Sequence, residues 1–436
     1  MSQTTAPLLF GRAGAELRVP ARTTILRAEH PVPLADPQQA IVAALNKPIG
    51  TAALAQLVAQ RRPRQVAITI SDITRPVPNA IFLPILLEVL NSKGVSDQQV
   101  TIVIGTGMHR PSTEAERLEL VGNDILRRCR VADHRADDAE SLVRISEDPP
   151  VSVNRIFATA DFRIVTGLIE PHFMAGYSGG RKGVCPALVD LQTVQRFHGH
   201  AILSDARASS GLIQGNPCHE ESLRVARQVG VDFLLNVAIN GQRKICGVYA
   251  GEMEAAHQAG VADVRRWTSV AVDKPFDVVI TCGGGYPLDQ TFYQSVKGMV
   301  AALPACHAGS SLFILSDCSE GIGSSSYAEV MLHWSNRWRE FLTHIASSRE
   351  VRKDQWQAQM HCRVLEHIGQ ERLLIASDGL PTETLARLWV TPVTGSGAAP
   401  QRLQHALDGY LRQHPQAGIA VIPEGPYTML VGAASR

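Results

Sequence analysis

Short runs of continuous hydrophobic residues alternate along the chain with longer segments that have the residue spacing of helices. The runs expected to form strands cover residues 65–70, 99–105, 162–169, 232–239, 276–281, 311–316, 372–377 and 418–423. Strands that are buried on both faces are hydrophobic at successive positions, which is typical of parallel sheets covered by helices. The segment 79–94 between the first two runs predicts such a covering helix. The pattern therefore predicts the α/β class.

A domain boundary is expected near residues 270–276. The segment 251–272 predicts a helix that runs into a short connector, and Asp273-Lys274-Pro275 interrupts the pattern before a new strand begins. We therefore expect two α/β domains, residues 1–273 and 274–436, with largely parallel sheets and an active-site cleft between them. The last residues are expected to pack back on the first domain.

The composition is that of a globular protein without a strong net charge. Hydrophobic residues make up 45% and charged residues 19%, and 42 Lys and Arg balance 41 Asp and Glu. This balance gives no electrostatic case for a nucleic acid or an anionic membrane as a partner. No apolar run approaches the ~20 residues that span a bilayer, and no secretory signal is visible. The eight Cys include no C-x-x-C pair, so free thiols in a reducing cytoplasm are expected.

Polar residues gather directly after four of the expected strands, within residues 71–78, 106–111, 170–183 and 282–297. In open α/β sheets, ligands bind beyond the carboxyl ends of the strands. These segments combine His, Arg, Lys, Asp and Gln with Gly and Pro. The sequence therefore predicts that the functional site lies at these strand ends.

Three side chains in these segments are candidates for acid–base chemistry or anion binding. Arg75 stands between Thr74 and Pro76, and a fixed guanidinium can hold a carboxylate or a phosphate. An equally good interpretation is a structural ion pair between Arg75 and the nearby Asp72. His109 and His172 each follow a strand, and two histidines so placed could act as acid and base on one carbon or could be structural.

Candidates for cofactor attachment and metal binding follow the third of these strands. Lys182 ends the glycine-rich stretch 176–183, where backbone N–H groups can approach an anion and the amine can bond covalently. His198 and His200 form a His-x-His pair, a weak indication of a metal site because imidazole suits nickel, zinc and copper. A loop lysine and ordinary helix histidines are the alternatives.

Gln294 and Lys297 are three residues apart on an expected helix, so they share one face, and Tyr293 precedes them. This face could bind an oxygen group of a substrate. An ordinary exposed helix surface would give the same pattern.

Taken together, these segments resemble the nickel-pincer lactate racemase family. The matching stretches are Ser71 to Pro78, Gly105 to Arg110, Glu170 to Gly183 with its sequel to His198, and Tyr286 to Lys297. Residues 45–50 and 422–426 are also similar, so the resemblance extends from about residue 45 to the C-terminus. The run H-F-M-A-G-Y-S-G-G-R-K-G, which contains Lys182, is its longest continuous part.

The resemblance implies a nickel cofactor. Members carry a nickel-pincer nucleotide, pyridinium-3,5-bisthiocarboxylic acid mononucleotide, which holds the metal in an S–C–S arrangement and is tethered to a lysine. The positions that match the tether and the nickel-binding histidine are Lys182 and His198. Further cofactor contacts are expected from four residues of the same segments: Asp72, Thr74, Gly179 and Gly180.

The resemblance also implies a racemase or epimerase that inverts C2 of a 2-hydroxy acid. His109 and His172 match the two acid–base residues, which exchange the hydroxyl proton while hydride leaves C2 and returns to its other face. The residues expected to hold the substrate are Arg75, Tyr293, Gln294, Lys297 and Trp356. The expected partners are the small 2-hydroxy acid and the proteins that make the cofactor, and the identity of the acid stays open.

Three other functions are alternatives. A nicotinamide-dependent dehydrogenase would use Gly283-Gly284-Gly285, although Tyr-Pro follows these glycines and the dinucleotide-binding pattern is G-x-G-x-x-G. A non-catalytic carrier of the nickel cofactor would need the lysine and the metal ligand but no pair of bases. A zinc hydrolase would use His198 and His200, for which no H-E-x-x-H motif supplies further ligands.

Overall fold

Two six-stranded sheets organise the computed structural model of the chain, which describes residues 2–348 and 350–432. The chain divides into two compact units. Unit 1 comprises the described residues of Met1–Glu29, Gly199–Ser204 and Thr268–Arg436, and unit 2 comprises His30–His198 and Asp205–Trp267. Unit 1 includes residues up to Glu29 and the segment Gly199–Ser204, both of which the division predicted from sequence assigns to the N-terminal domain.

The sheet of unit 2 is parallel except for one edge strand. Its strands in spatial order are β13 (Ile245–Gly251), β12 (Phe233–Ile239), β9 (Phe162–Leu168), β4 (Val66–Ser71), β5 (Val100–Gly105) and β6 (Arg130–Asp133), and only β13 is antiparallel to its neighbour. Strand β4 is buried at its first five positions, as the hydrophobic run predicts. The α/β class and the four strands predicted in this unit are confirmed.

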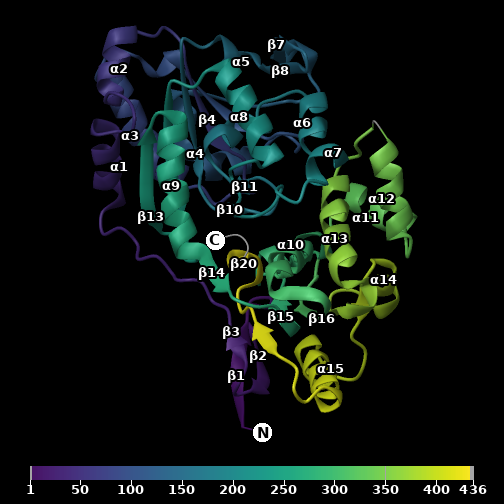
Figure 1. Cartoon of the computed structure of the whole chain (residues 1–436). Helices are drawn as coiled ribbons and strands as arrows, with labels where there is room; N and C mark the ends of the chain where they lie inside the picture. Colours follow the sequence, from purple (N-terminus) through teal and green to yellow (C-terminus); the bar gives the residue numbers. More distant parts are fainter. Residues whose placement is uncertain (1, 349, 433–436) are drawn as a thin grey trace. The chain divides into compact units, whose positions relative to one another are not determined.

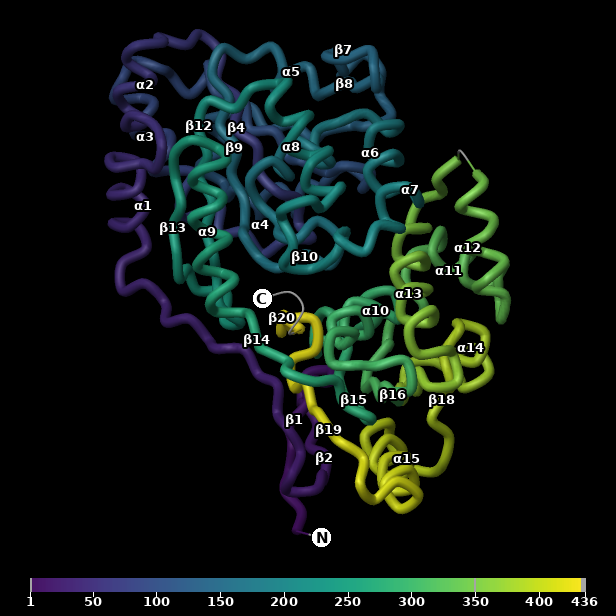
Figure 2. Tube along the Cα trace, in the orientation of Figure 1, coloured from purple at the N-terminus to yellow at the C-terminus, as the bar shows by residue number. Residues whose placement is uncertain are grey.

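Helices cover both faces of this sheet (Figures 1 and 2). Those on one face are α1 (Pro37–Asn46), α2 (Leu54–Arg61), α3 (Asn79–Asn91) and α4 (Glu114–Arg128). Their side chains form one hydrophobic cluster with inward-facing strand residues such as Ile68 and Ile102. On the other face lie α5 (Arg155–Thr159), α8 (Pro217–Val229) and α9 (Met253–Thr268).

The order of the strands creates a position in unit 2 where ligands bind in related folds. The chain starts in the middle of the sheet at β4 and proceeds outward through β5 and β6, then returns to the other side of β4 with β9 and proceeds through β12 and β13. The loops that leave β4 and β9 therefore run in opposite directions. Such a reversal opens a crevice at the carboxyl ends of the two strands.

The segment between β9 and α8 is irregular and carries several short elements. These are β10 (Pro171–His172), β11 (Gly176–Tyr177), the 3-10 helix η3 (Gly180–Gly183) and α6 (Leu191–Phe197). The hairpin of β7 (Leu142–Glu147) and β8 (Pro150–Asn154) precedes β9. Helix α7 (His200–Leu203) follows α6 in the chain but belongs to unit 1.

The sheet of unit 1 is entirely parallel. Its strands in spatial order are β18 (Thr391–Pro392), β17 (Leu373–Ala376), β16 (Cys306–Leu315), β15 (Phe276–Cys282), β19 (Ile419–Val421) and β3 (Thr24–Ile25). Its helices are α10 (Phe292–Ala301), α11 (Ser325–His333), α12 (Trp338–Ser347), α13 (Gln355–Ile368), α14 (Thr382–Arg387) and α15 (Ala399–Gln413). The four strands predicted in this part of the chain are also confirmed.

The N-terminal segment of the chain adds to the core of unit 1. Strands β1 (Gln3–Leu8) and β2 (Ala15–Pro20) form an antiparallel hairpin, and its inward-facing Ala6 and Leu17 join the same hydrophobic cluster as Leu403 and Leu407 of α15. Near the other end of the chain, β20 (Met429–Gly432) pairs with β14 (Ser269–Val272) in parallel.

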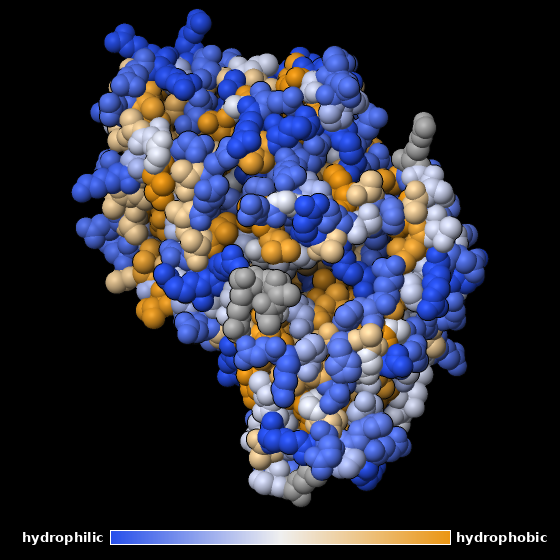
Figure 3. Space-filling view, viewed as in Figure 1, coloured by the Kyte–Doolittle hydropathy of each residue, from blue (hydrophilic) through white to orange (hydrophobic). Residues whose placement is uncertain are grey.

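The surface is mixed in character. Hydrophilic residues predominate on the face drawn in Figure 3, with small groups of hydrophobic residues between them. None of the helices in the described residues is both long enough and apolar enough to cross a bilayer.

Candidate functional site

The carboxyl ends of β4, β5 and β9 bring several of the predicted site residues together in unit 2. Asp72, Thr74 and Arg75 follow β4, His109 follows β5, and the segment from Glu170 to Lys182 follows β9. Because β4 and β9 flank the point where the chain reverses, these loops lie at the position where such folds bind ligands.

His109 is oriented by Asp72. The Nδ1 atom of His109 lies 2.6 Å from Oδ2 of Asp72, while the other carboxylate oxygen accepts hydrogen bonds from the backbone N–H and the hydroxyl of Thr74. Burial opposes the ionisation of Asp72, but the hydrogen bonds with His109 and Thr74 outweigh it and lower the pKa of the carboxyl group. The carboxylate thus holds the imidazole ring of His109, whose side chain is about half exposed.

Arg75 pairs with Glu170 across the reversal point. Its Nη1 atom lies 2.8 Å from Oε1 of Glu170, and both side chains remain about one third exposed. The ion pair between Arg75 and Asp72 that the sequence suggests as one alternative is therefore wrong, because Asp72 faces His109 instead. The pair joins the loop after β4 to the loop after β9.

His172 is held by its own loop. It lies in β10, which pairs with β11 in a tight turn, and its side chain is buried. The Nδ1 atom of His172 accepts hydrogen bonds from the backbone N–H groups of Met174 at 3.3 Å and Ala175 at 3.2 Å. The turn therefore fixes the orientation of the ring.

The loop that carries Lys182 is rigidly packed. Gly179 and Gly180 have positive φ angles, and a Cβ atom at Gly180 would lie 2.6 Å from the imidazole ring of His257. The buried guanidinium of Arg181 donates hydrogen bonds to the carbonyl groups of Ala175 at 2.8 Å and Tyr177 at 2.9 Å. These contacts fix the backbone on which Lys182 stands.

Lys182 has the environment of a reactive amine. Its Nζ atom lies 5.0 Å from the ring centroid of Phe197. Burial, followed by the positive charges of Arg181 and Arg75, lowers the pKa of Lys182 to about 7. A substantial share of the amine is therefore neutral near pH ~7, as a nucleophile must be.

His198 has the properties of a metal ligand, whereas the side chain of His200 contacts Gln359. Nδ1 of His198 lies 2.9 Å from the carbonyl oxygen of Val194, so this nitrogen carries the proton and Nε2 carries the lone pair. Burial, followed by the charge of Lys182, lowers the pKa of His198 to about 3. His200 belongs to unit 1, where its Nδ1 atom lies 3.1 Å from Nε2 of Gln359.

The described part of the chain forms no metal site of the kind that a zinc hydrolase uses. Within the described residues, no three His, Cys, Asp or Glu side chains lie together in a group that could hold a metal ion. Because a zinc hydrolase normally needs three protein ligands, the zinc interpretation of His198 and His200 has no support.

The remaining predicted residues lie in unit 1. Tyr293, Gln294 and Lys297 are on α10, whose first turn is capped by the side chain of Thr291. Trp356 is at the start of α13, and the neighbouring Gln357 donates a hydrogen bond to the backbone carbonyl group of Tyr293. Helix α13 thus supports the start of α10.

The glycine-rich loop after β15 is occupied by the protein itself. A Cβ atom at Gly284 would lie 2.9 Å from Leu288 and 3.1 Å from Pro426, and a Cβ atom at Gly285 would lie 3.0 Å from Leu9. In a dinucleotide-binding fold, the corresponding glycines leave space for a pyrophosphate. The packing around Gly284 and Gly285 therefore argues against the dehydrogenase interpretation.

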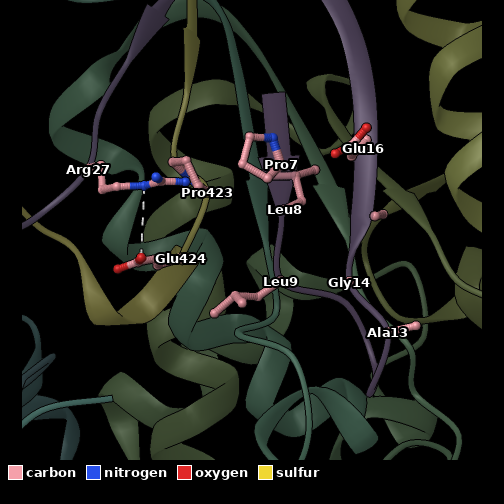
Figure 4. A pocket seen from close by; sticks show the side chains of 10 residues that line it. Pro7, Leu8, Leu9, Ala13, Gly14, Glu16, Arg27, Pro423 and Glu424 are labelled. Atoms are coloured by element: carbon pink, nitrogen blue, oxygen red, sulfur yellow. Dashed lines mark ion pairs between the residues drawn. The ribbon is translucent and has the colours of Figure 1, made fainter. Parts of the chain in front are cut away.

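A cavity of about 510 Å³ lies elsewhere in unit 1, between the β1–β2 hairpin and the loop after β19 (Figure 4). Arg27 and Glu424 form an ion pair of 3.9 Å at its edge. The cavity is lined by none of the predicted site residues.

Sequence reasoning missed three contributions to this site. Glu170 was within a matching stretch, and its place directly after a strand could have identified it as the partner of Arg75. The role of Asp72 in orienting His109 and the burial of Arg181 depend on contacts between distant segments. No local pattern in the sequence indicates them.

Comparison with known proteins identifies the family. A model of the lactate racemase N-terminal domain matches residues 10–211, and a model of the lactate racemase C-terminal domain matches residues 271–430. The lactate racemase of Lactiplantibacillus plantarum is 33% identical over 395 residues, which is 89% of each chain. The chain belongs to the lactate racemase family.

Two further comparisons agree with this family assignment. The lactate racemase of Thermoanaerobacterium thermosaccharolyticum is 33% identical over 387 residues, 88% of each chain. The solved structure of the lactate racemase apoprotein from that organism superposes with a TM-score of 0.89 at 30% identity, covering 98% of this chain and 100% of that one. A Thermotoga maritima protein with a TM-score of 0.65 and 16% identity, covering 92% of this chain, shares the fold. The protein is therefore an isomerase, a racemase, as the sequence predicts.

Proposed function

We propose that this member of the lactate racemase family inverts C2 of a 2-hydroxy acid as a racemase or epimerase, with a nickel-pincer nucleotide attached to Lys182. The observation that carries the proposal is the pairing, in the same part of unit 2, of a lysine amine with a lowered pKa and a partly buried His198 whose Nδ1 atom faces the carbonyl group of Val194. One supplies a nucleophile for a covalent tether, and the other supplies a nitrogen lone pair for nickel.

The residues present fit this cofactor. The carbonyl group of Val194 keeps the proton of His198 on Nδ1, which leaves Nε2 to coordinate a metal. Gly179 and Gly180 pack closely against Asn236 and His257 and so fix the backbone next to Lys182. We assign these two glycines, together with Asp72 and Thr74, to the cofactor side. When bound, the nickel-pincer nucleotide supplies an acceptor and donor of hydride for C2 of the substrate.

The substrate would be held through its carboxylate by Arg75, whose fork-shaped guanidinium suits a planar anion. Glu170 holds one end of this guanidinium and so restricts its orientation. We assign additional substrate contacts to four residues of unit 1: Tyr293, Gln294, Lys297 and Trp356.

His109 and His172 would exchange the proton of the substrate hydroxyl group. Asp72 stabilises the positive charge that forms on His109 when its Nε2 atom accepts this proton. His172 would exchange the proton with the substrate oxygen in the other enantiomer, in which C2 has the opposite configuration.

We infer a cytoplasmic location from the proposed cofactor and from the cysteines. Proteins that synthesise the nucleotide would be transient partners. All eight cysteines are buried and free, which fits a reducing cytoplasm.

The proposal is tested by the intact mass and nickel content of protein produced together with a biosynthetic system for the cofactor. We expect an adduct that maps to Lys182 and about one nickel per chain, both lost in Lys182→Ala and kept in the control Lys274→Ala, whose side chain is exposed. A panel of single-enantiomer 2-hydroxy acids then identifies the substrate. Unmodified protein without nickel, from a system that loads a known lactate racemase, would contradict the proposal.

A further inference from the structure

The two histidines of the site make opposite kinds of hydrogen bond through the same ring atom. Nδ1 of His109 faces the carboxylate of Asp72, which can only accept a hydrogen bond when it is ionised. Nδ1 of His172 faces the backbone N–H groups of Met174 and Ala175, which can only donate. The surroundings of the rings therefore place the proton differently in each.

For His109, the carboxylate requires a proton on Nδ1. The carboxylate of Asp72 keeps Oδ2 directed at His109, because its other oxygen, Oδ1, accepts hydrogen bonds from both the N–H group and the hydroxyl of Thr74. In the neutral ring, the lone pair is then on Nε2. The side chain is about half exposed, so a substrate hydroxyl group can reach it.

For His172, the two amide groups require a lone pair on Nδ1. A proton on that atom would point at two N–H groups at 3.3 and 3.2 Å and would remove both hydrogen bonds in a buried setting. In the neutral ring, the proton is then on Nε2.

We propose that the resting protein holds His109 and His172 in opposite neutral tautomers, so that His109 is the base and His172 is a hydrogen-bond donor. This inference concerns the site of the proposed function and rests on it for its catalytic meaning. Asp72 and the amide groups of Met174 and Ala175 are the positioning groups that set the difference.

The two enantiomers of a substrate would therefore meet histidine rings that differ in the protonation of Nε2. A hydroxyl group that faces His109 can transfer its proton to Nε2 as the ring stands: the O–H bond breaks, an Nε2–H bond forms, and the oxygen keeps the electron pair. The hydride acceptor that C2 then needs would be supplied by the nickel-pincer nucleotide of the proposed function. A hydroxyl group that faces His172 meets an Nε2–H group. His172 must first lose that proton or turn its ring before it can act as a base.

The tautomers can be measured without the cofactor. Nitrogen-15 NMR of histidine-labelled, unloaded protein at a pH above the ordinary histidine pKa separates protonated from unprotonated ring nitrogens. His109→Gln and His172→Gln assign the signals. We expect protonated Nδ1 in His109 and protonated Nε2 in His172, and the same tautomer in both rings would overturn the inference.

A substitution of Asp72 tests the cause. In Asp72→Asn, the amide oxygen stays with the two donors of Thr74, so the amide N–H₂ group faces Nδ1 of His109. The proton of His109 should move to Nε2, and in loaded protein the racemase rate should fall by roughly 100-fold or more, as a wrong tautomer does in serine proteases. Unchanged His109 signals in the folded variant would contradict the assigned role of Asp72.

The matched control is Thr74→Val, which removes the hydroxyl group but keeps the backbone N–H group and the contact between Asp72 and His109. Its NMR signals should show His109 with the proton still on Nδ1. Because these measurements use unloaded protein, they succeed or fail independently of the mass and nickel measurements that test the proposed function.

Discussion

Buried histidines should make the stability of this protein sensitive to acid, and His361 is one of them. It is fully buried on α13 between the rings of Phe292 and Trp389, and in the described structure neither ring nitrogen has a hydrogen-bond partner. Burial lowers the pKa of His361 to about 3. Between that value and the ordinary ~6.5, the unfolded chain binds a proton that the folded chain does not, so stability falls as the pH falls through this window.

We therefore expect His361→Phe to raise the free energy of unfolding by about 2 kcal/mol more at pH ~5 than at pH ~8. Denaturant unfolding at the two pH values measures the difference. The matched comparison is His134→Phe. Burial also lowers the pKa of His134, to about 4, so this variant should show a similar difference between the two pH values, but the Nε2 atom of His134 bonds to the carbonyl group of Val189 at 3.0 Å. His134→Phe should therefore destabilise the protein at pH ~8, where His361→Phe should not.

At the scale of single residues, the sequence indicates candidate side chains but not the residues that they contact. It pointed to Arg75, His109, His172, Lys182 and His198, because each follows a strand or stands in a matching stretch. It could not show that Arg75 meets Glu170 and that Asp72 meets His109, since these pairs join loops from different strands. Such contacts depend on the order of the strands in the sheet.

At the scale of elements, the η3 loop should tolerate no side chain at Gly180. A Cβ atom there would lie 2.6 Å from His257, and the φ angle of +55° is unfavourable for other residues. We expect Gly180→Ala to lower the free energy of unfolding by roughly 3 kcal/mol or more, since it combines backbone strain with overpacking. It should also reduce attachment of the cofactor to Lys182, as intact mass would show.

Gly94→Ala is the control for this prediction. Gly94 also has a positive φ angle, +84°, but a Cβ atom there would meet nothing within 4 Å. Backbone strain alone should cost about 1 kcal/mol. Equal losses of stability in the two variants, measured by denaturant unfolding, would show that the packing against His257 is unimportant.

The elements that the sequence predicted are those with a continuous hydrophobic pattern. All eight expected strands are present, because central parallel strands are buried on both faces. The β1–β2 hairpin was not predicted, since β1 buries only two of its six residues, and the short edge strand β3 has both residues exposed. A half-exposed or very short strand leaves little hydrophobic signal.

At the scale of the whole molecule, the division into units could not be derived from local pattern. Unit 1 combines the N-terminal residues up to Glu29, the short segment Gly199–Ser204 and the C-terminal part of the chain. Such a division depends on contacts between residues far apart in sequence. A boundary drawn where a helix ends and a strand begins cannot show that the chain enters the same unit three times.

This division leads to a prediction about unfolding, because each unit has its own hydrophobic core. Leu17 of β2 is in the core of unit 1, and four of the five tryptophans, at positions 334, 338, 356 and 389, are also in that unit. We expect Leu17→Ala to lower the stability reported by tryptophan fluorescence by about 2–5 kcal/mol, as a buried leucine truncation does. The N-terminal hairpin would then act on tryptophans more than 300 residues away in sequence.

Leu86→Ala supplies the comparison, because Leu86 is equally buried but belongs to the core of unit 2. It should leave the fluorescence transition in place and shift a second transition followed by hydrogen exchange of the amide groups in β4 and β9. If both variants moved both transitions by the same amount, the two cores would unfold as one cooperative unit. If Leu17→Ala moved only the exchange of β4 and β9, the assignment of the hairpin to unit 1 would be wrong.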